Sequence, residues 1–149
     1  MSEVAFNPVW LFVLIPLALI VIFPLMWILV VWLISLTSGW QQLAARYPAT
    51  QPATGRKWLG QFGLVNRARY SNVLNLTTDD TGVWIEVIPL FRINHPPLFI
   101  PWHDIHSPQP VTFRWHQLVQ VDVGHPRVAT LRLPPEVFQQ SPIGTNVPT

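Results

Sequence analysis

Histidines are the side chains of this sequence with the most obvious capacity for chemistry. Of the five, His95, His103 and His106 lie within one short region, and Asp104 stands between the last two. Imidazole and carboxylate groups are zinc ligands, so a metal site has to be considered. The spacing argues against one, because the chain has no cysteine and nothing indicates a helix that would present two rings together. We predict no metal and no other cofactor, and whether these histidines bind anything stays open.

Other catalytic patterns are weaker still. No motif pairs a serine with a base, since the serines fall in an apolar segment, at its edge or in turns. Asp79 and Asp80 are adjacent, but they open the sequence Asp-Asp-Thr-Gly, where aspartate favours a turn. A glycine-rich phosphate loop is missing from the sequence. The sequence therefore predicts a protein that is not an enzyme.

Basic residues form a more prominent group. Five of them follow a long apolar segment, with no acidic residue before Asp79: Arg46, Arg56, Lys57, Arg67 and Arg69. Near an anionic membrane surface each such cation adds about 1 kcal/mol of attraction. They can act as a topology signal with general headgroup contact, or as a specific anionic-lipid site. A net charge of only +2 argues against a nucleic-acid partner.

The element that positions this basic group is an apolar segment long enough to cross a membrane. No charged residue occurs from Val4 to Ala45, and Val9–Leu36 is almost purely Val, Leu, Ile, Phe and Trp. At a rise of about 1.5 Å per residue this run reaches about 42 Å, against a hydrocarbon core of about 30 Å. We predict one transmembrane helix over residues 9–36, loosened by Pro16 and Pro24. A hairpin turning at Pro24 and a cleaved signal peptide are less favoured alternatives.

The flanking residues orient this helix. Only Glu3 precedes it and the basic group follows, so the positive-inside rule leaves residues 1–8 outside a bacterial inner membrane and the rest in the cytoplasm. The absence of cysteine agrees with a reducing compartment. Trp27 is expected to lie deeper in the membrane, against lipid or a partner helix. The expected anchors at the membrane interfaces are Trp10, Trp32 and Trp40.

Residues 37–55 should connect the membrane helix to the rest of the chain. Ser38 and Gln41 have the spacing of a helix cap, and Pro48 ends the short helix that follows. This helix can lie on the membrane surface, continue the span, or pack on the next domain, and the sequence does not decide among these. Residues 49–55 read as a linker. The apolar stripe of the short helix consists of Trp40, Leu43, Ala44 and Tyr47.

Residues 56–140 carry the alternation of short β-strands, in six or seven segments. A one- or two-turn helix over 134–140 should cover an open end of the sheet with Val137 and Phe138, and residues 141–149 should form a loose tail. The predicted fold is a membrane-anchored α+β protein, mainly β, built as a small barrel or sandwich. The expected strands are Lys57–Val65, Tyr70–Thr78, 83–88, Leu98–Trp102, 111–116, 119–123 and Arg127–Leu133.

Prolines mark one strand as an edge. Pro101 cannot donate to a ladder, and further prolines precede and follow Leu98–Trp102. An exposed edge bearing Leu98, Ile100 and Trp102 can accept a partner peptide by strand addition. The alternative is that these prolines only prevent aggregation through the edge.

The sequence Leu98-Phe99-Ile100-Pro101-Trp102-His103-Asp104-Ile105, with the order of elements around it, resembles small membrane-anchored proteins that carry a bacterial pleckstrin-homology-like domain. The resemblance covers about Leu59–Gln140. It implies two nearly orthogonal antiparallel sheets capped by a terminal helix, and little about a ligand.

Together these features predict a non-catalytic membrane-anchored binding or scaffold protein. We expect an accessory or assembly subunit of a membrane complex, whose partners are the lipid bilayer and a membrane protein. The alternative is a module that binds or senses anionic lipid through the basic group.

Overall fold

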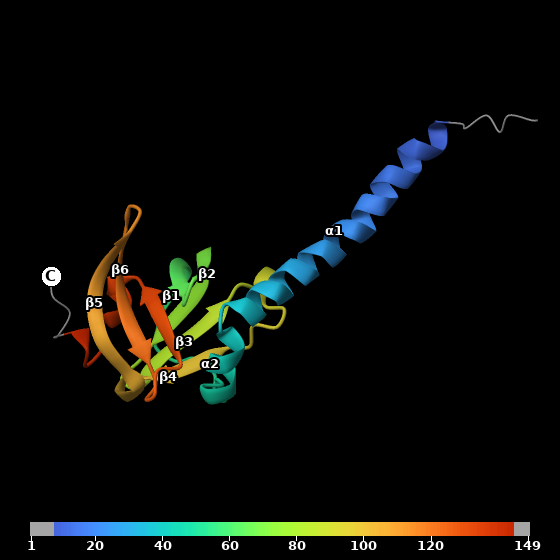
Figure 1. Cartoon of the computed structure of the whole chain (residues 1–149). Helices are drawn as coiled ribbons and strands as arrows, with labels where there is room; N and C mark the ends of the chain where they lie inside the picture. The colour runs from blue at the N-terminus through green and yellow to red at the C-terminus, as the bar shows by residue number, and fades with distance from the viewer. Residues whose placement is uncertain (1–7, 145–149) are drawn as a thin grey trace, which may run out of the picture.

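The computed structural model describes residues 8–144. Helix α1 (Val9–Thr37) is followed by helix α2 (Trp40–Arg46) and a β-sheet domain (Figure 1). Three short 3-10 helices lie between or after the strands: η1 (Pro89–Phe91), η2 (Trp102–Asp104) and η3 (Pro135–Phe138). The strands are β1 (Arg56–Val65), β2 (Ala68–Thr78), β3 (Gly82–Val87), β4 (Leu98–Pro101), β5 (Ile105–Phe113), β6 (His116–Val123) and β7 (Ala129–Leu133).

Helix α1 leaves the sheet domain as a single rod (Figure 1). It runs unbroken through Pro16 and Pro24, so the alternative of a hairpin turning at Pro24 is wrong. From Val9 to Val30 its side chains are exposed, with the partial exception of Trp27. By length and composition α1 is able to cross a membrane.

All seven strands belong to one antiparallel sheet, in the order β4-β3-β2-β1-β7-β6-β5. Strand β1 joins the two halves, because it pairs with β2 along its length and with β7 through Leu64 and Val65. Its register shifts between Trp58 and Gly63, where the strand bends. The two separate sheets that the resemblance implies are therefore halves of one continuous sheet.

The connection between β4 and β5 explains why the sheet is curled. These strands are the two edges of the sheet, yet only the three residues of η2 separate them in the chain. The edges must approach each other at η2, so the sheet closes into a half-barrel around its core. At one end η3 places Val137 and Phe138 in that core, each 1% exposed. Their predicted covering role is confirmed, although the helix is of the 3-10 type.

The first residues of the expected loose tail are ordered against the domain. Ser141 is buried and Ile143 packs against the core, so the prediction of a loose tail is wrong for these residues. Residues 145–149 lie outside the described residues. Residues 1–7, which are most of the N-terminal segment expected outside the membrane, also lie outside the described residues.

The hairpin of β5 and β6 differs most from prediction. Strand β5 begins at Ile105 and includes Pro108 and Pro110, which an edge strand tolerates. The alternation was expected to continue from Phe113 to Trp115 on one face. Instead Arg114 has a φ of 57° and starts the turn, which leaves Trp115 78% exposed at the tip.

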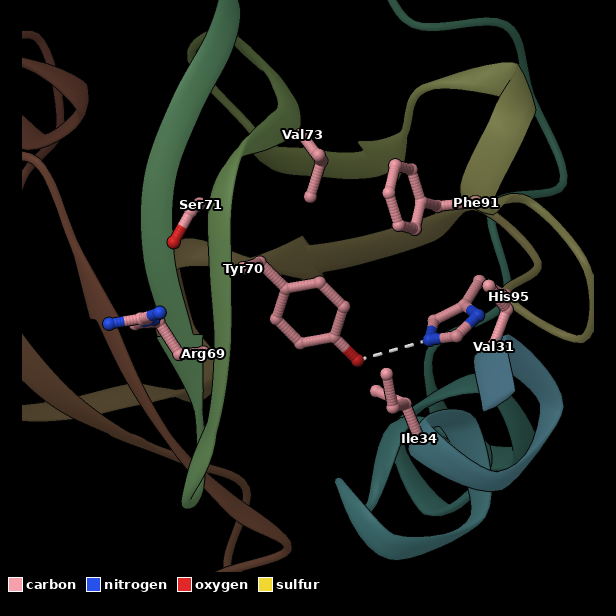
Figure 2. Close-up of a pocket in the computed structure, with 8 residues that line it drawn as sticks. All are labelled: Val31, Ile34, Arg69, Tyr70, Ser71, Val73, Phe91 and His95. Carbon is pink, nitrogen blue, oxygen red and sulfur yellow. Dashed lines mark hydrogen bonds between the residues drawn. The ribbon is translucent and has the colours of Figure 1, made fainter. Parts of the chain in front are cut away.

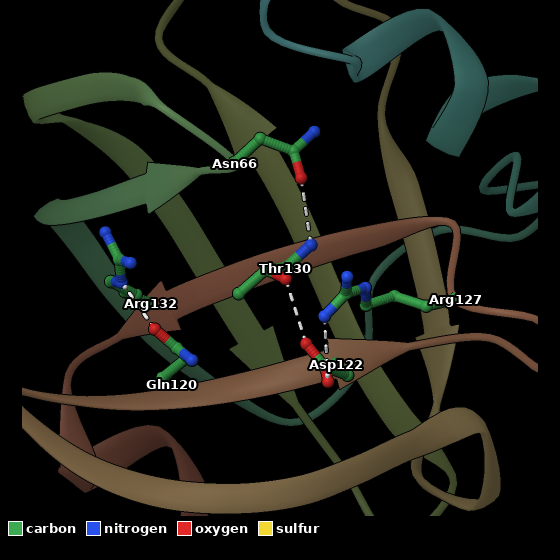
Figure 3. Close-up of polar contacts among 6 residues, drawn as sticks. All are labelled: Asn66, Gln120, Asp122, Arg127, Thr130 and Arg132. Atoms are coloured by element: carbon green, nitrogen blue, oxygen red, sulfur yellow. Dashed lines mark hydrogen bonds and ion pairs between the residues drawn. The ribbon is translucent and has the colours of Figure 1, made fainter.

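Polar side chains fix the register of β6 and β7 on their outer face (Figure 3). The side chain of Arg132 donates to Gln120 across the strand pair at 2.8 Å, and Thr130 donates to Asp122 at 2.9 Å. Asn66, in the β1–β2 turn, accepts from the Thr130 backbone N–H at 3.0 Å and donates to the Ser38 carbonyl at 2.8 Å. The sheet is thereby tied to the end of α1.

Candidate functional site at the helix–sheet junction

The last turns of α1 pack on the sheet domain. Val31 is 2% exposed and Ser35 is fully buried, in contrast to the exposed residues before them. The chain then reverses at Gly39, whose φ of 80° glycine adopts without strain. Trp40 and Leu43 of α2 are fully buried. Helix α2 therefore packs on the domain, and the alternative that it lies on a membrane surface is wrong.

This burial also corrects one predicted membrane anchor. The Trp40 ring lies in the core, and its indole N–H donates to the Pro96 carbonyl at 3.0 Å. It cannot reach lipid headgroups. Trp10 and Trp32 are 66% and 44% exposed, so their anchoring role stays a prediction.

Partly buried hydrogen bonds connect α1 and α2 to the loop before β4. The Ser35 hydroxyl accepts from the Asn94 side-chain amide at 2.6 Å, and the Gln41 side chain donates to the Asn94 carbonyl. The predicted pairing of Gln41 with Ser38 is therefore not formed. Ser38 accepts from the Trp40 backbone N–H at 3.2 Å instead. Because Ser35 and Gln41 both bond Asn94, α1 has a defined direction relative to the loop before β4.

His95 belongs to this junction. Its Nδ1 lies 2.9 Å from the Ile93 carbonyl, which can only accept, so Nδ1 carries the proton. Its Nε2 therefore accepts from the Tyr70 hydroxyl, 3.0 Å away. Burial lowers the pKa of His95 and raises the pKa of Tyr70 to about 12. Both side chains are neutral at physiological pH.

The histidines predicted as possible ligands are not brought together. His103 is exposed beside Asp104, while the His106 ring packs on His125 with 5.7 Å between ring centroids. Within residues 8–144 no three His, Asp or Glu side chains are grouped so that they could hold a metal ion. His95 acts as a structural hydrogen-bonding residue.

A pocket of about 200 Å³ opens between α1, β2 and η1 (Figure 2). Most of its wall is apolar, and Tyr70 and His95 meet at its floor. Arg69 also borders it from β2, but its guanidinium points away from the Tyr70 ring (Figure 2). The lining residues are Val31, Ile34, Arg69, Tyr70, Ser71, Val73, Phe91 and His95.

Arg69 also borders a second hollow, of about 310 Å³, below the β5–β6 tip. There the Phe62 ring stacks on His116 at 4.2 Å, and the Arg114 guanidinium lies 5.9 Å from the Trp115 ring. Arg69 thus stands between an apolar pocket and a surface of aromatic and basic side chains. Sequence reasoning missed Arg114 and Trp115, because their alternation with Phe113 looked like a core strand.

The predicted basic group is divided by the fold. Arg67 and Arg69 lie at the β1–β2 turn, close to the end of α1. Arg56 and Lys57 are at the other end of β1, up to about 30 Å away at 3.3 Å per residue. Arg46 lies at the end of α2, 3.4 Å from the His125 carbonyl. All five are exposed, but they do not form one cluster.

The predicted partner edge is occupied by the chain itself. Strand β4 is an edge strand, as expected. Leu98 and Ile100 are fully buried, and Trp102 belongs to η2 with its indole donating to the Asp79 carbonyl at 2.8 Å. Residues 47–49 pair with this edge, through Phe99 N–H to the Tyr47 carbonyl and Ala49 N–H to the Pro97 carbonyl. A partner strand has no access at that point.

Comparison with known proteins identifies no relative. The chain matches no protein-family model, no curated protein and no solved structure. The resemblance to pleckstrin-homology-like proteins thus stays a prediction.

Proposed function

We propose that this protein is a non-catalytic, single-pass membrane protein with a pleckstrin-homology-like domain, and that it serves as an accessory or assembly subunit of a membrane complex. The observation that carries this proposal is the combination of an exposed apolar helix with a rigid junction. Helix α1 is exposed from Val9 to Val30, apart from Trp27, and it is held on the domain at Val31 and Ser35. A bound partner helix would thus set the orientation of the whole domain.

The junction supports an anchor that stays in place. Val31, Ile34 and Ser35 of α1 form part of the domain's own contacts, and removal of the helix would expose Phe91 and Tyr70. Exposing apolar surface to water costs about 25 cal/mol per Å². A bilayer supplies the missing cover for α1. The basic residues that follow the helix favour a cytoplasmic domain.

The prolines of α1 support a protein partner. Pro16 and Pro24 lack the N–H groups that would bond the carbonyls of Phe12 and Ile20. In hydrocarbon such carbonyls need another donor, which neighbouring helices can provide. We therefore place the partner contact on α1 rather than on the edge of β4.

Isolation of the intact protein from its own membranes tests this function. We expect tagged full-length protein, extracted in mild detergent, to retain a stoichiometric membrane protein identified by mass spectrometry. A matched variant replaces residues 9–26 by a Leu/Ala helix of equal length and keeps residues 27–37. This variant should stay membrane-bound, and the amount of partner that co-purifies with it should fall at least tenfold. Purification of the wild-type chain alone, even after cross-linking in membranes, would contradict the proposal.

Anionic-lipid binding is the second candidate, favoured by the position of Arg69. This residue stands between the apolar junction pocket and the aromatic surface around Trp115. A headgroup phosphate at the guanidinium would leave an acyl chain beside the pocket. Such a site would use Arg67 and Arg69 but not Arg56 and Lys57.

The division of the basic group provides a matched test. In nanodiscs of mixed lipid, Arg67→Gln with Arg69→Gln should reduce the anionic lipid that co-purifies with the full-length protein about threefold or more. Arg56→Gln with Lys57→Gln removes the same charge at the far end of β1 and should leave it unchanged. Equal losses from both pairs would indicate general attraction and contradict a specific site.

A further inference from the structure

The loop around η1 carries an apolar tip beside α1. Leu90 is 61% exposed at this tip. The Trp27 indole N–H of α1 donates to the Leu90 carbonyl at 3.3 Å, and the Trp27 and Phe91 rings meet edge to face at 5.0 Å. Trp27 also stacks on Phe23 at 6.3 Å. A continuous aromatic surface therefore passes from the exposed part of α1 into the loop.

The position of Trp27 gives the height of this loop along the helix. Trp27 lies ten residues before Thr37, where α1 ends, which is about 15 Å along the axis. Eighteen residue steps separate it from Val9, or about 27 Å. A hydrocarbon core is about 30 Å thick. If α1 spans the membrane from Val9, the η1 loop stands at the inner boundary of the hydrocarbon.

The carbonyl groups of the tip are suited to an apolar environment. Carbonyls exposed to hydrocarbon need donors, and three consecutive ones have them here. The Ile88 carbonyl accepts from Phe91 N–H at 2.9 Å, and the Pro89 carbonyl accepts from Arg92 N–H at 3.2 Å. The Leu90 carbonyl accepts from Trp27, and Pro89 has no N–H to satisfy.

We propose that the η1 loop is a second, non-spanning membrane contact that inserts Leu90 among the acyl chains beside α1, while Phe91 packs against Trp27 and the core. Arg92, exposed at the base of the loop, then reaches the headgroup phosphates. This inference rests on the proposed membrane span. An exposed leucine alone is ordinary on protein surfaces, but Leu90 is continuous with the lipid-facing surface of α1.

The absence of cysteine from the chain permits a direct test. Single variants Leu90→Cys, Leu59→Cys and Leu19→Cys place a nitroxide or a fluorophore at three exposed leucines, which are 61%, 69% and 60% exposed. Leu59 on β1 is the matched control, and Leu19 reports on the span. The full-length protein is reconstituted as single copies in nanodiscs. Accessibility to oxygen and to a water-soluble nickel chelate, and quenching by doxyl lipid, are measured at each position.

We expect quenching by doxyl lipid to be at least threefold stronger at Leu90 and Leu19 than at Leu59. If Leu90 behaves like Leu59 while Leu19 lies in lipid, the loop contact is overturned and the span stands. If Leu19 is in water too, the proposed membrane anchor itself fails. Protection of Leu90 from both oxygen and nickel would show that protein covers the tip, which also overturns lipid insertion.

Discussion

His95 illustrates how a residue of catalytic type becomes structural through its surroundings. In the sequence it is one of three histidines near a carboxylate. In the structure its Nδ1–H donates to the Ile93 carbonyl and its Nε2 accepts from the Tyr70 hydroxyl. The contact with Tyr70 joins residues that the junction brings together, which local spacing does not reveal.

The Tyr70 hydroxyl should contribute measurably to stability. Tyr70→Phe keeps the ring in the core but leaves the buried His95 Nε2 without a donor. We expect a loss of about 1–2 kcal/mol in the free energy of unfolding. Chemical unfolding in detergent, followed by tryptophan fluorescence, measures it. An unchanged transition midpoint would contradict the role assigned to this pair.

The buried His95 also predicts a pH dependence. Burial lowers the pKa of His95 in the folded protein below its ordinary 6.5, so below pH 6.5 the unfolded chain binds more protons than the folded one. The contribution of buried His95 to the free energy of unfolding should be fully present above pH 6.5 and should be lost as the pH decreases below it. His95→Gln should reduce this loss, whereas His103→Gln, at an exposed position, should not. Thermal unfolding between pH 5 and pH 8 provides the comparison.

At the level of elements, periodicity predicted α1, the strand-rich domain and the closing helix, because each depends on apolar patterns along the chain. It failed where contacts distant in sequence decide. Gln41 bonds Asn94 rather than Ser38. The chain turns at Arg114, so Trp115 does not reach the core position that continued alternation would give it. The curl of the sheet around η2 likewise depends on strand order, which no local pattern contains.

The reversal between α1 and α2 depends on Gly39. A Cβ there would lie 2.4 Å from the Asn66 side-chain nitrogen, which donates to the Ser38 carbonyl. Gly39→Ala should therefore cost clearly more than the about 1 kcal/mol of a left-handed alanine. Gly60→Ala, with a φ of 60° and its nearest contact at 3.6 Å, should show that backbone cost alone. Unfolding free energies of both variants test the difference.

The contact between α1 and η1 makes a separate prediction. Trp27→Phe retains an aromatic ring against Phe91 but removes the donor to the Leu90 carbonyl. We expect about 1 kcal/mol less protection in the loop, seen as faster amide hydrogen exchange at residues 88–93. Trp32→Phe, at an exposed position of α1, should leave these exchange rates unchanged.

At the scale of the whole molecule, the sequence identified the basic residues but not their arrangement. Five cations within 24 positions look like one cluster, yet the length of β1 places Arg56 and Lys57 far from Arg67 and Arg69. The junction pocket was not predicted either, since it forms from α1, β2 and η1 together. Sites of this kind depend on tertiary contacts.

The proposed orientation can be checked on spheroplasts. With Lys57→Cys as the single cysteine, a membrane-impermeant maleimide should label spheroplasts only after permeabilisation, because the positive-inside rule places the sheet domain in the cytoplasm. Pro8→Cys, at the exposed residue directly before α1, should be labelled without permeabilisation. The reverse pattern would invert the proposed topology.

The contacts between the sheet domain and α1 affect which bilayer thickness would suit the proposed membrane span. Since Trp27, Val31 and Ser35 are fixed by the domain, the free part of α1 has a set length of about 27 Å and cannot slide inward to adjust. A thicker bilayer must thin locally or draw the domain against its surface, and a thinner one must tilt the rod. If α1 spans a membrane as proposed, the protein should concentrate where the hydrocarbon thickness of the bilayer matches this length of about 27 Å.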